Sequence, residues 1–539
     1  MPSPLSQPRV FLLLLVLFPG IARGEDVENG DWLDPAGIDG TLLLAPGGVK
    51  EEIVTEFHRR LPRDPHVVVL SPEGERDAEP ELEALLAAWK ANRRGELRFV
   101  GVRPGAEESV VRAKDAISAA DTIWLLGCSA SGEEPRELPK ELAIACRELL
   151  ARKGRLAVCG EAVALAGPLR AGEQPEAGWG LLPDLLITSP ETPAAWIEAV
   201  HASESGITTC ELPAATMLLV FDRLIQASRG GKAVLRWPAT KREAEKAREL
   251  GDSKIADLTA VRRIARQRLG PPFPPEEPAA VRVENGTLIV IGGGGMPRGL
   301  WERFIELAGG ENAKIVVLPT ANVETEEEGN SLAALLRRGG AGKVTVLSQR
   351  TREEVESDEF REALGEATGV WFGGGRQWRF VDAYLDTAAL PLMHDVLRRG
   401  GVIAGSSAGA SIQGEYMARG DPLGNLNIIA EGYERGLGFL PGAAIDQHFT
   451  QRQRQGDMEE LISRYPQLLG IGIDESTAIV VQGEEAEVVG PGDAYFYNGR
   501  IMNDAGGPTM QSLGAGRRYN LRERRAIPVE EEAEAGAEN

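Results

Sequence analysis

The chain repeats itself, because four short motifs of its first half return in the same order in its second half. The pairs are GTLLLA at 40–45 with GTLIVI at 286–291, IWL at 123–125 with VWF at 370–372, GRLA at 154–157 with GVIA at 401–404, and GWGLLP at 178–183 with GLGFLP at 436–441. The spacing within the pairs drifts only slightly along the chain. We therefore interpret the halves as diverged copies of one folding unit.

A proline-rich segment, GPPFPPEEP at residues 270–278, separates the two copies. Proline can neither continue a helix nor pair in the middle of a sheet, so this segment reads as a linker. We predict a first domain over 25–269, a linker over 270–280 and a second domain over 281–525. The acidic end of the chain, 526–539, lacks aromatic residues and is expected to be disordered.

Each copy alternates short apolar runs with longer amphipathic stretches. In the second copy the expected strands are 288–291, 314–318, 344–347, 370–372 and 402–404, and helices are expected at 299–308 and 386–399. This alternation is typical of a parallel sheet with helices on both faces. It predicts two tandem three-layer α/β domains whose functional loops follow the C-terminal ends of the strands.

The first residues predict export. Arg9 precedes an unbroken apolar run over 10–18, and Ala22 and Gly24 suit cleavage by signal peptidase before Glu25. The run is far shorter than the ~20 residues that span a bilayer. We expect a signal peptide over 1–24 and a periplasmic or extracellular protein with no other membrane association, the alternative being an uncleaved N-terminal anchor.

Charge and cysteine content narrow the function classes. The net charge of −22 disfavours a nucleic acid as partner. All cysteines (Cys128, Cys146, Cys159 and Cys210) lie in the first copy, where an exported chain could pair them in three ways. None belongs to a CxxC motif, so we expect no zinc site. The second copy lacks cysteine, which excludes a cysteine nucleophile there.

The strongest chemical signal is GVIAGSSAGAS at 401–411. An apolar run leads into a G-x-S-x-G pattern centred on Ser407, and small residues that can begin a helix follow, as in a nucleophile elbow. The glycines let neighbouring backbone approach closely. Free N–H groups at the start of the helix lie where an oxyanion would form. The pattern predicts Ser407 as a nucleophile.

A serine nucleophile needs a base and a group that orients the base. Of the two histidines in the second copy, His394 lies within an expected helix and is expected to pack there. His448 follows an apolar run in AIDQHFTQRQR, at an expected strand end where catalytic groups collect. Asp474 and Glu475 follow the next apolar run and offer a carboxylate, with Asp446 as a rival.

These motifs resemble the cyanophycinase and dipeptidase E family of serine peptidases. The matching stretches are FGGGRQ at 372–377, GSSAGA at 405–410, DQHF at 446–449 and GIGIDE at 470–475, in order within about residues 284–510. The resemblance implies a flavodoxin-like fold related to class I amidotransferases, and acyl transfer without a metal or organic cofactor. It is nearer to cyanophycinase, whose substrate is a poly-aspartate chain carrying arginine on each side chain.

The resemblance also implies a role for individual residues. The implied triad is Ser407, His448 and Glu475, the implied oxyanion hole uses backbone N–H groups of Ala408 and of Gly374 or Gly375, and the implied substrate pocket is lined by Gln377, Asp446, Gln447, Arg452 and Arg454. The sequence departs from the family pattern at two positions, Arg376 and Asp457. The identity of the substrate therefore stays undecided between cyanophycin, β-aspartyl dipeptides, other acidic peptides and an unrelated peptide.

The first copy is expected to be inactive. Alignment of the repeats without gaps puts Gly160 at the place of Ser407, Pro190 at that of His448 and Leu212 at that of Glu475; Leu126, Gly127 and Cys128 fall on the glycine loop. We predict that the first domain is a structural partner in an internal pseudo-dimer, with Cys159 as a buried thiol. An alternative for the first domain is that it binds substrate or cell-surface material. For the whole chain, the alternatives to a serine peptidase are a non-enzymatic exported binding protein and an amidotransferase-like enzyme.

Overall fold

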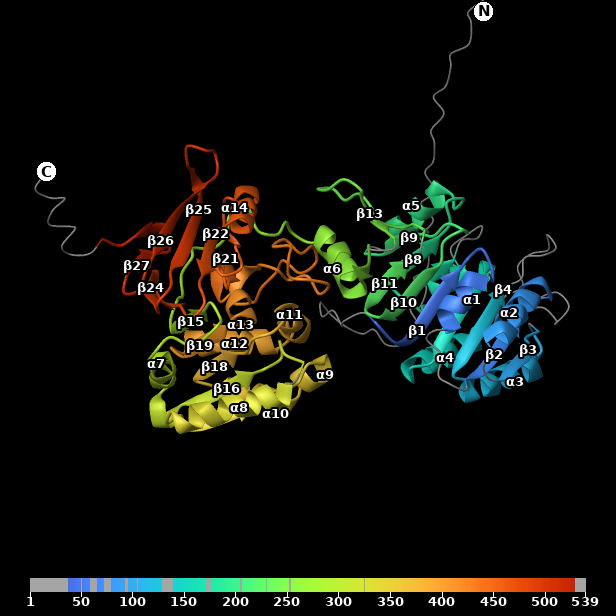
Figure 1. Ribbon diagram of the computed structural model, residues 1–539, viewed down its shortest axis with the longest axis horizontal. Coiled ribbons are helices and arrows are strands. Elements are labelled where there is room, and N and C mark those ends of the chain that lie inside the picture. The colour runs from blue at the N-terminus through green and yellow to red at the C-terminus, as the bar shows by residue number, and fades with distance from the viewer. Residues whose placement is uncertain are drawn as a thin grey trace, which may run out of the picture.

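The computed structural model describes residues 37–49, 51–58, 65–71, 79–92, 96–103, 105–127, 139–170, 176–203, 206–228, 230–251, 254–323 and 325–528. They form two α/β domains that follow one another along the chain (Figure 1). The predicted signal peptide, Cys128 and residues 529–539 of the predicted tail lie outside the described residues. Among the described helices, none is long and apolar enough to cross a membrane.

The central sheet of the second domain is parallel on one side and antiparallel on the other. Its spatial order is β17 (Lys343–Val346), β16 (Lys314–Leu318), β18 (Gly369–Phe372), β19 (Val402–Ser406), β15 (Thr287–Ile291), β23 (Ala478–Gln482), β24 (Glu485–Val489), β27 (Arg518–Asn520) and β28 (Arg525–Ala526). The first five strands of this order, from β17 through β15, are parallel to one another. From β15 onward each strand is antiparallel to the next. Strands β17, β16, β18 and β19 follow the order of a flavodoxin-like sheet, and β15 occupies the next position.

The central sheet of the first domain has the same order and the same strand directions. It runs β3 (Glu96–Gly101), β2 (His66–Ser71), β4 (Thr122–Gly127), β5 (Arg155–Gly160), β1 (Ile38–Ala45), β10 (Leu218–Asp222), β11 (Leu224–Ala227) and β14 (Ala256–Asp257). Here too the strands up to β1 are parallel and those beyond it antiparallel.

A smaller sheet stands beside each central one, again with matching directions. In the second domain it runs β20 (Gly414–Met417), β21 (Leu440–Gln447), β22 (Leu469–Ile473), β25 (Ala494–Met502) and β26 (Pro508–Leu513); in the first it runs β8 (Leu185–Thr188), β9 (Thr208–Glu211), β12 (Ala233–Trp237) and β13 (Lys246–Leu250), with a separate pair β6 (Leu169–Arg170) and β7 (Glu176–Ala177). The parallel pair β21–β22 corresponds to β8–β9. Two diverged copies of one unit would share such a topology.

Helices cover both faces of the central sheets, as the prediction of three layers requires. The first domain contains α1 (Glu51–His58), α2 (Glu79–Asn92), α3 (Glu107–Ala119), α4 (Glu141–Ala151), η1 (Glu161–Ala166), α5 (Ala194–Ser203) and α6 (Leu258–Leu269); the second contains α7 (Leu300–Leu307), η2 (Gly310–Asn312), α8 (Thr325–Arg338), α9 (Arg352–Val355), α10 (Asp358–Glu366), α11 (Trp378–Tyr384), α12 (Ala389–Arg398), α13 (Ala408–Ser411) and α14 (Gln455–Arg464). Successive residues of β15 point to opposite faces, so Leu288 and Val290 join one core cluster and Ile289 and Ile291 the other. The α/β three-layer prediction is confirmed.

The predicted strands of the second domain agree with β15 to β19 within one or two residues. The predicted helix over 386–399 begins later, at Ala389, because Asp386 has φ +63° and so cannot belong to a right-handed helix.

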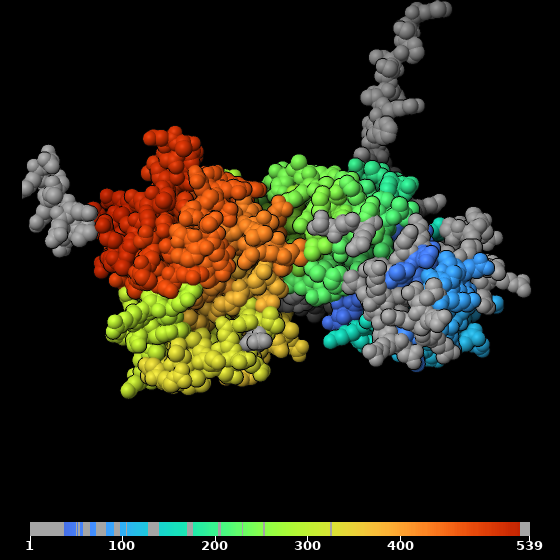
Figure 2. Space-filling view, viewed as in Figure 1, coloured from blue at the N-terminus to red at the C-terminus, as the bar shows by residue number. Residues whose placement is uncertain are grey.

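The two domains touch through α6 (Figure 1). Ala260 of α6 belongs to the core cluster of the second domain. Gly432 lies so close to α6 that an added Cβ would stand 2.7 Å from the Ala260 carbonyl oxygen. Figure 2 shows the seam where the green residues of the first domain abut the orange segment of the second. The linker packs on this side as well, with Phe273 stacked on Tyr416 at 6.1 Å between ring centroids.

Candidate active site

Ser407 lies at the sharp turn between β19 and α13. Its backbone has φ +55° and ψ −112°, a conformation that residues with a side chain rarely adopt. A Cβ on Gly405 would stand 2.2 Å from the Gly409 carbonyl oxygen, and a Cβ on Gly409 would stand 2.2 Å from that of Phe372. Close backbone contact therefore requires both glycines of the G-x-S-x-G pattern.

Three side chains form one hydrogen-bonded row. Ser407 Oγ lies 2.9 Å from His448 Nε2, and His448 Nδ1 lies 2.6 Å from Glu475 Oε1. His448 follows β21 and Glu475 follows β22, so both stand at the C-terminal ends of parallel strands. With its Nδ1–H donated to the carboxylate, a neutral His448 presents the bare Nε2 to the serine hydroxyl.

Burial keeps this histidine neutral. The His448 side chain is 9% exposed, and desolvation lowers its pKa below the ordinary value. The hydrogen bond to Glu475 opposes that shift, and the nearby charge of Arg452 reinforces it. The imidazole is therefore suited to accept a proton at neutral pH.

Asp474, the neighbour of Glu475, has a structural role. Its carboxylate accepts from the backbone N–H of Thr450 at 3.0 Å and from the Thr450 hydroxyl at 2.6 Å. It thereby ties the turn after His448 to the turn after β22. Of the two adjacent acids only Glu475 reaches the imidazole.

A glycine run after β15, residues 292–295, holds the row in place, and the sequence motifs of the expected site did not include it. The backbone N–H of Ser407 donates to the Ile291 carbonyl at 3.0 Å, and that of His448 donates to the Gly292 carbonyl at 2.8 Å. A Cβ on Gly293 would stand 2.3 Å from His448 Cε1, and one on Gly294 would stand 2.6 Å from Glu475 Oε2. The signal was visible in the sequence as four glycines directly after a predicted strand.

Backbone donors lie beside the nucleophile. Gly374 packs against Ser407, since its added Cβ would stand 3.9 Å from Ser407 Cβ. Within the part of the chain that the structure describes, the backbone N–H groups of Gly374, Gly375 and Ala408 make no hydrogen bond. Free donors at this position suit an oxyanion.

Three of the residues expected to line the substrate pocket are committed to protein partners instead. The Gln377 amide donates to the carbonyls of Ala418 and Arg419 at 2.8 Å each. The fully buried Asp446 accepts from Arg419 Nε at 2.9 Å and from Arg454 Nη1 at 2.7 Å. Because an unpaired buried charge is costly, these groups build the wall behind the site rather than its open surface.

The other two residues expected in the pocket, Arg452 and Gln447, differ in exposure. Arg452 is exposed, in the turn that follows His448. Gln447 is buried, and its side-chain Oε1 has no hydrogen-bond partner among the described residues. Of the five, Arg452 is the one whose side chain is exposed, whereas the Gln447 oxygen is enclosed by protein.

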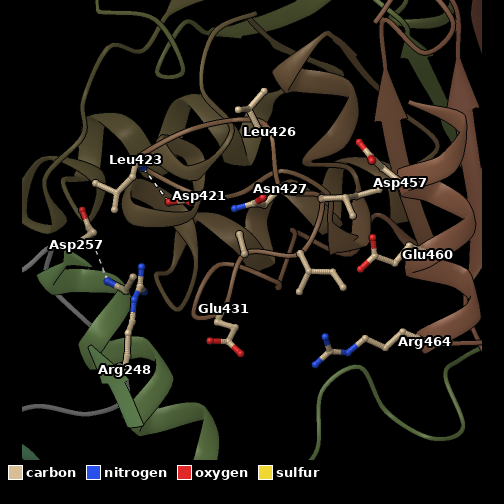
Figure 3. A pocket seen from close by; sticks show the side chains of 14 residues that line it. Arg248, Asp257, Asp421, Leu423, Leu426, Asn427, Glu431, Asp457, Glu460 and Arg464 are labelled. Carbon is tan, nitrogen blue, oxygen red and sulfur yellow. Dashed lines mark hydrogen bonds between the residues drawn. The ribbon is translucent and has the colours of Figure 1, made fainter. Parts of the chain in front are cut away.

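The two departures from the family pattern anchor one loop. Arg376 Nη2 donates to the carbonyls of Asp421 and Gly424 at 2.6 and 2.7 Å, and Asp457 accepts from Arg419 at 2.6 Å. The anchored loop lines a cavity of about 410 Å³ between the domains. Figure 3 shows Arg248 and Asp257 of the first domain on one side of it, and Asp457, Glu460 and Arg464 of the second domain on the other.

The first domain keeps the turn but lacks the reactive groups. Gly160 follows Cys159, which pairs with Ala45 as Ser406 pairs with Ile291, so Gly160 occupies the place of Ser407. Its backbone has φ +65° and ψ −145° and leads into η1, as Ser407 leads into α13.

The register of the small sheets locates the other two positions. Leu185 lies opposite Thr208 as Ala443 lies opposite Leu469, and counting onward puts Pro190 at the place of His448 and Ala214 at that of Glu475. The alignment of the sequences had put Leu212 there, which is wrong by two residues because the strand register shortens this connection by three residues and not by five.

The described cysteines all lie inside the first domain. Cys146, Cys159 and Cys210 are buried, Cys146 and Cys210 are free thiols, and burial raises the pKa of these two to about 12. Within the described ranges, no group of His, Cys, Asp and Glu side chains is arranged to hold a metal ion.

Comparison with known proteins points to one family. The profile of "Peptidase family S51" matches residues 288–489. The cyanophycinase of Geminocystis herdmanii is 32% identical over 225 residues, which are 41% of this chain and 83% of that protein. Peptidase E of Shewanella amazonensis is 26% identical over 165 residues, 28% of this chain and 68% of that protein. A crystal structure of a peptidase from an acI-B1 Actinobacterium covers 44% of this chain and 97% of its own, with 23% identity and a TM-score of 0.36.

Proposed function

The chain belongs to peptidase family S51, and from this premise we propose that its second domain is a serine-type peptidase that forms an acyl-enzyme on Ser407. The observation that carries the proposal is the continuous row from Ser407 Oγ through the His448 imidazole to the Glu475 carboxylate, with distances of 2.9 and 2.6 Å.

The proposal assigns one group to each step of acyl transfer. His448 Nε2 takes the hydroxyl proton as Ser407 Oγ attacks the scissile carbonyl, and Glu475 stabilises the imidazolium. The oxyanion accepts from the backbone N–H groups of Ala408 and the 373–375 loop, each worth about 3–4 kcal/mol in comparable enzymes. The imidazolium then protonates the leaving amine. Water, deprotonated by the same imidazole, hydrolyses the ester and restores the serine.

The proposed substrates are peptides or isopeptides of cyanophycin-like or other aspartyl-containing material. Two observations support this class: relatives that carry the name cyanophycinase, and the exposed guanidinium of Arg452 beside His448, which suits a carboxylate. Because Arg376 and Asp457 anchor the loop around residue 421, they affect specificity through the shape of that loop.

The proposal extends to the whole chain. The apolar run over 10–18 supports export to the periplasm or the exterior. The shared topology and the loss of all three reactive groups at Gly160, Pro190 and Ala214 support an inactive first copy that pairs with the second within one chain.

The direct test is release of Asp-Arg dipeptide from insoluble cyanophycin by the purified protein, with Ser407→Ala as the matched control. Release that disappears in the control establishes nucleophile and substrate together. No release, but labelling of Ser407 by a fluorophosphonate, keeps the serine mechanism and discards cyanophycin. Neither release nor labelling overturns the proposal and favours a binding protein.

A further inference from the structure

A cluster of buried charges joins the two domains. Asp382 of α11, which is 6% exposed, accepts from two arginines of the first domain: from Arg223 Nη1 at 2.6 Å and from Arg263 Nη2 at 3.1 Å. Within the second domain, the Tyr433 hydroxyl donates to the same carboxylate at 2.8 Å. The only acid in α11 is thus held mainly by side chains of the other domain.

The two arginines are fixed in turn by the first domain and by aromatic rings. Arg223 donates from Nε and Nη2 to the Asp257 carboxylate at 2.9 and 3.0 Å, and its guanidinium lies 4.5 Å from the centre of the Trp378 ring. The Arg263 guanidinium lies 5.1 Å from the centre of the Tyr433 ring. Two acids balance two bases, so the cluster is neutral only when both domains are in place.

The cluster lies one helix away from the nucleophile. Helix α11 begins at Trp378, directly after the glycine loop whose Gly374 packs on Ser407. The connection is short and tight. The backbone N–H of Arg376 donates to the Ala321 carbonyl at 2.9 Å, and Arg379 Nη1 donates to the same oxygen at 2.7 Å. A rotation of α11 therefore moves the glycine loop.

We propose that the first domain, though inactive itself, positions the oxyanion loop of the second domain, and that Arg223 and Arg263 are the positioning residues. The inference rests on the proposed peptidase function, because it assigns the loop a part in acyl transfer. Displacing a reacting group by about 1 Å can cost about 100-fold in rate, so a modest shift of α11 is sufficient to matter.

The test uses the full-length protein with Arg263→Gln, the charge-retaining Arg263→Lys, and Tyr433→Phe as the milder variant should Arg263→Gln not fold. Lys246→Gln is the matched control, since Lys246 pairs with Glu431 across the same interface without touching α11. Two quantities are measured: the rate of Ser407 acylation by a fluorophosphonate, and amide hydrogen exchange of residues 373–384.

We expect Arg263→Gln to acylate about 10- to 100-fold more slowly and to exchange faster over 373–377, with partial rescue in Arg263→Lys and wild-type behaviour in Lys246→Gln. Unchanged exchange and acylation in Arg263→Gln and Tyr433→Phe overturn the inference. The same losses in Lys246→Gln also overturn it, because any disturbance of the interface would then suffice. If the wild type is not labelled but exchange still rises in Arg263→Gln, the peptidase proposal fails while the positioning of the loop stands.

Discussion

At the scale of single residues, the proposed base His448 is expected to determine the pH range of activity. Its pKa is lowered mainly by burial, and the base must be unprotonated, so activity is lost only as pH falls through this lowered value. We expect the acidic limb of kcat/KM below about pH 6.5, the ordinary histidine value. Glu475→Gln removes a group that raises the pKa, so it shifts the limb further down and lowers kcat by about 10⁴-fold. A pH profile with its acidic limb above 6.5 contradicts this.

The glycine run allows a sharper test of the same residue. Gly293→Ala places a Cβ 2.3 Å from His448 Cε1, so the imidazole must move and we expect at least about 100-fold loss of kcat/KM. Gly299→Ala is the matched control, since its φ of +79° resembles the +92° of Gly293 while its Cβ meets nothing within 4 Å. Both variants lose stability through strain, and only the first should lose activity. Equal activities refute the role of the run.

The strained backbone of Ser407 predicts that the nucleophile lowers the stability of the protein. At φ +55° a glycine is unstrained, whereas an alanine is strained. We therefore expect the free energy of unfolding of Ser407→Gly to exceed that of Ser407→Ala by about 1 kcal/mol, and both variants to be inactive. Urea denaturation of the two variants measures the difference. A more stable alanine variant would show that the turn is not strained.

The role of a residue could be predicted from the sequence where a reaction requires a particular side chain at the end of a strand. It could not be predicted where the role depends on a partner from a distant part of the chain. Ser407, His448 and Glu475 each follow an apolar run, and the structure brings them together. Asp446 follows one as well, yet its role depends on Arg419, which comes from the segment after β20 with φ +58°. Nothing in the local sequence of Asp446 indicates that neighbour.

At the scale of elements, the turn from strand to helix persists in the first domain without its nucleophile. Gly160→Ser restores the side chain but not its partners, because Pro190 and Ala214 stand where a base and an acid are needed. We expect no fluorophosphonate labelling at residue 160. We also expect the free energy of unfolding to fall by about 1–3 kcal/mol, because φ is +65° there. Labelling at residue 160 of the Gly160→Ser variant in a Ser407→Ala background would contradict the assignment of this domain as inactive.

The elements that the sequence predicts well are the parallel strands. Buried along nearly their whole length, β15, β16, β18 and β19 are continuous or nearly continuous apolar runs, and such runs are recognisable without tertiary information. The antiparallel extension through β24, β27 and β28 went unpredicted, because β27 and β28 are short and because β24 and β27 carry exposed charges such as Glu485 and Arg518. Their place depends on pairing with β23 rather than on their own pattern.

At the scale of the whole molecule, the repeat predicted two domains but not how they meet. The contact of Arg263 with Asp382 joins residues far apart in the chain, and neither lies in a repeated motif. From the sequence alone, Asp382 is indistinguishable from an ordinary polar residue on the surface of a helix. Only the assembled molecule reveals that its counter-charges come from the other copy, and that this copy contributes to the core through Ala260.

This arrangement predicts the behaviour of the isolated second domain, residues 281–539. Without the first domain, Asp382 loses two guanidinium partners and Ala260 leaves the core cluster. Breaking a buried ion pair from one side costs about 3–5 kcal/mol. We therefore expect a clearly lower melting temperature and slower Ser407 acylation than in the full chain.

Separately produced residues 25–269 should restore both properties when added to the isolated domain, because the charges of the cluster are then balanced again. An alternative is that two copies of the isolated second domain associate and cover each other's exposed face. Size-exclusion chromatography distinguishes such a dimer from a complex of the two different domains. A monomeric fragment with the stability and acylation rate of the full chain would remove the structural role of the first domain. The first copy would then be free for a separate task, such as binding substrate.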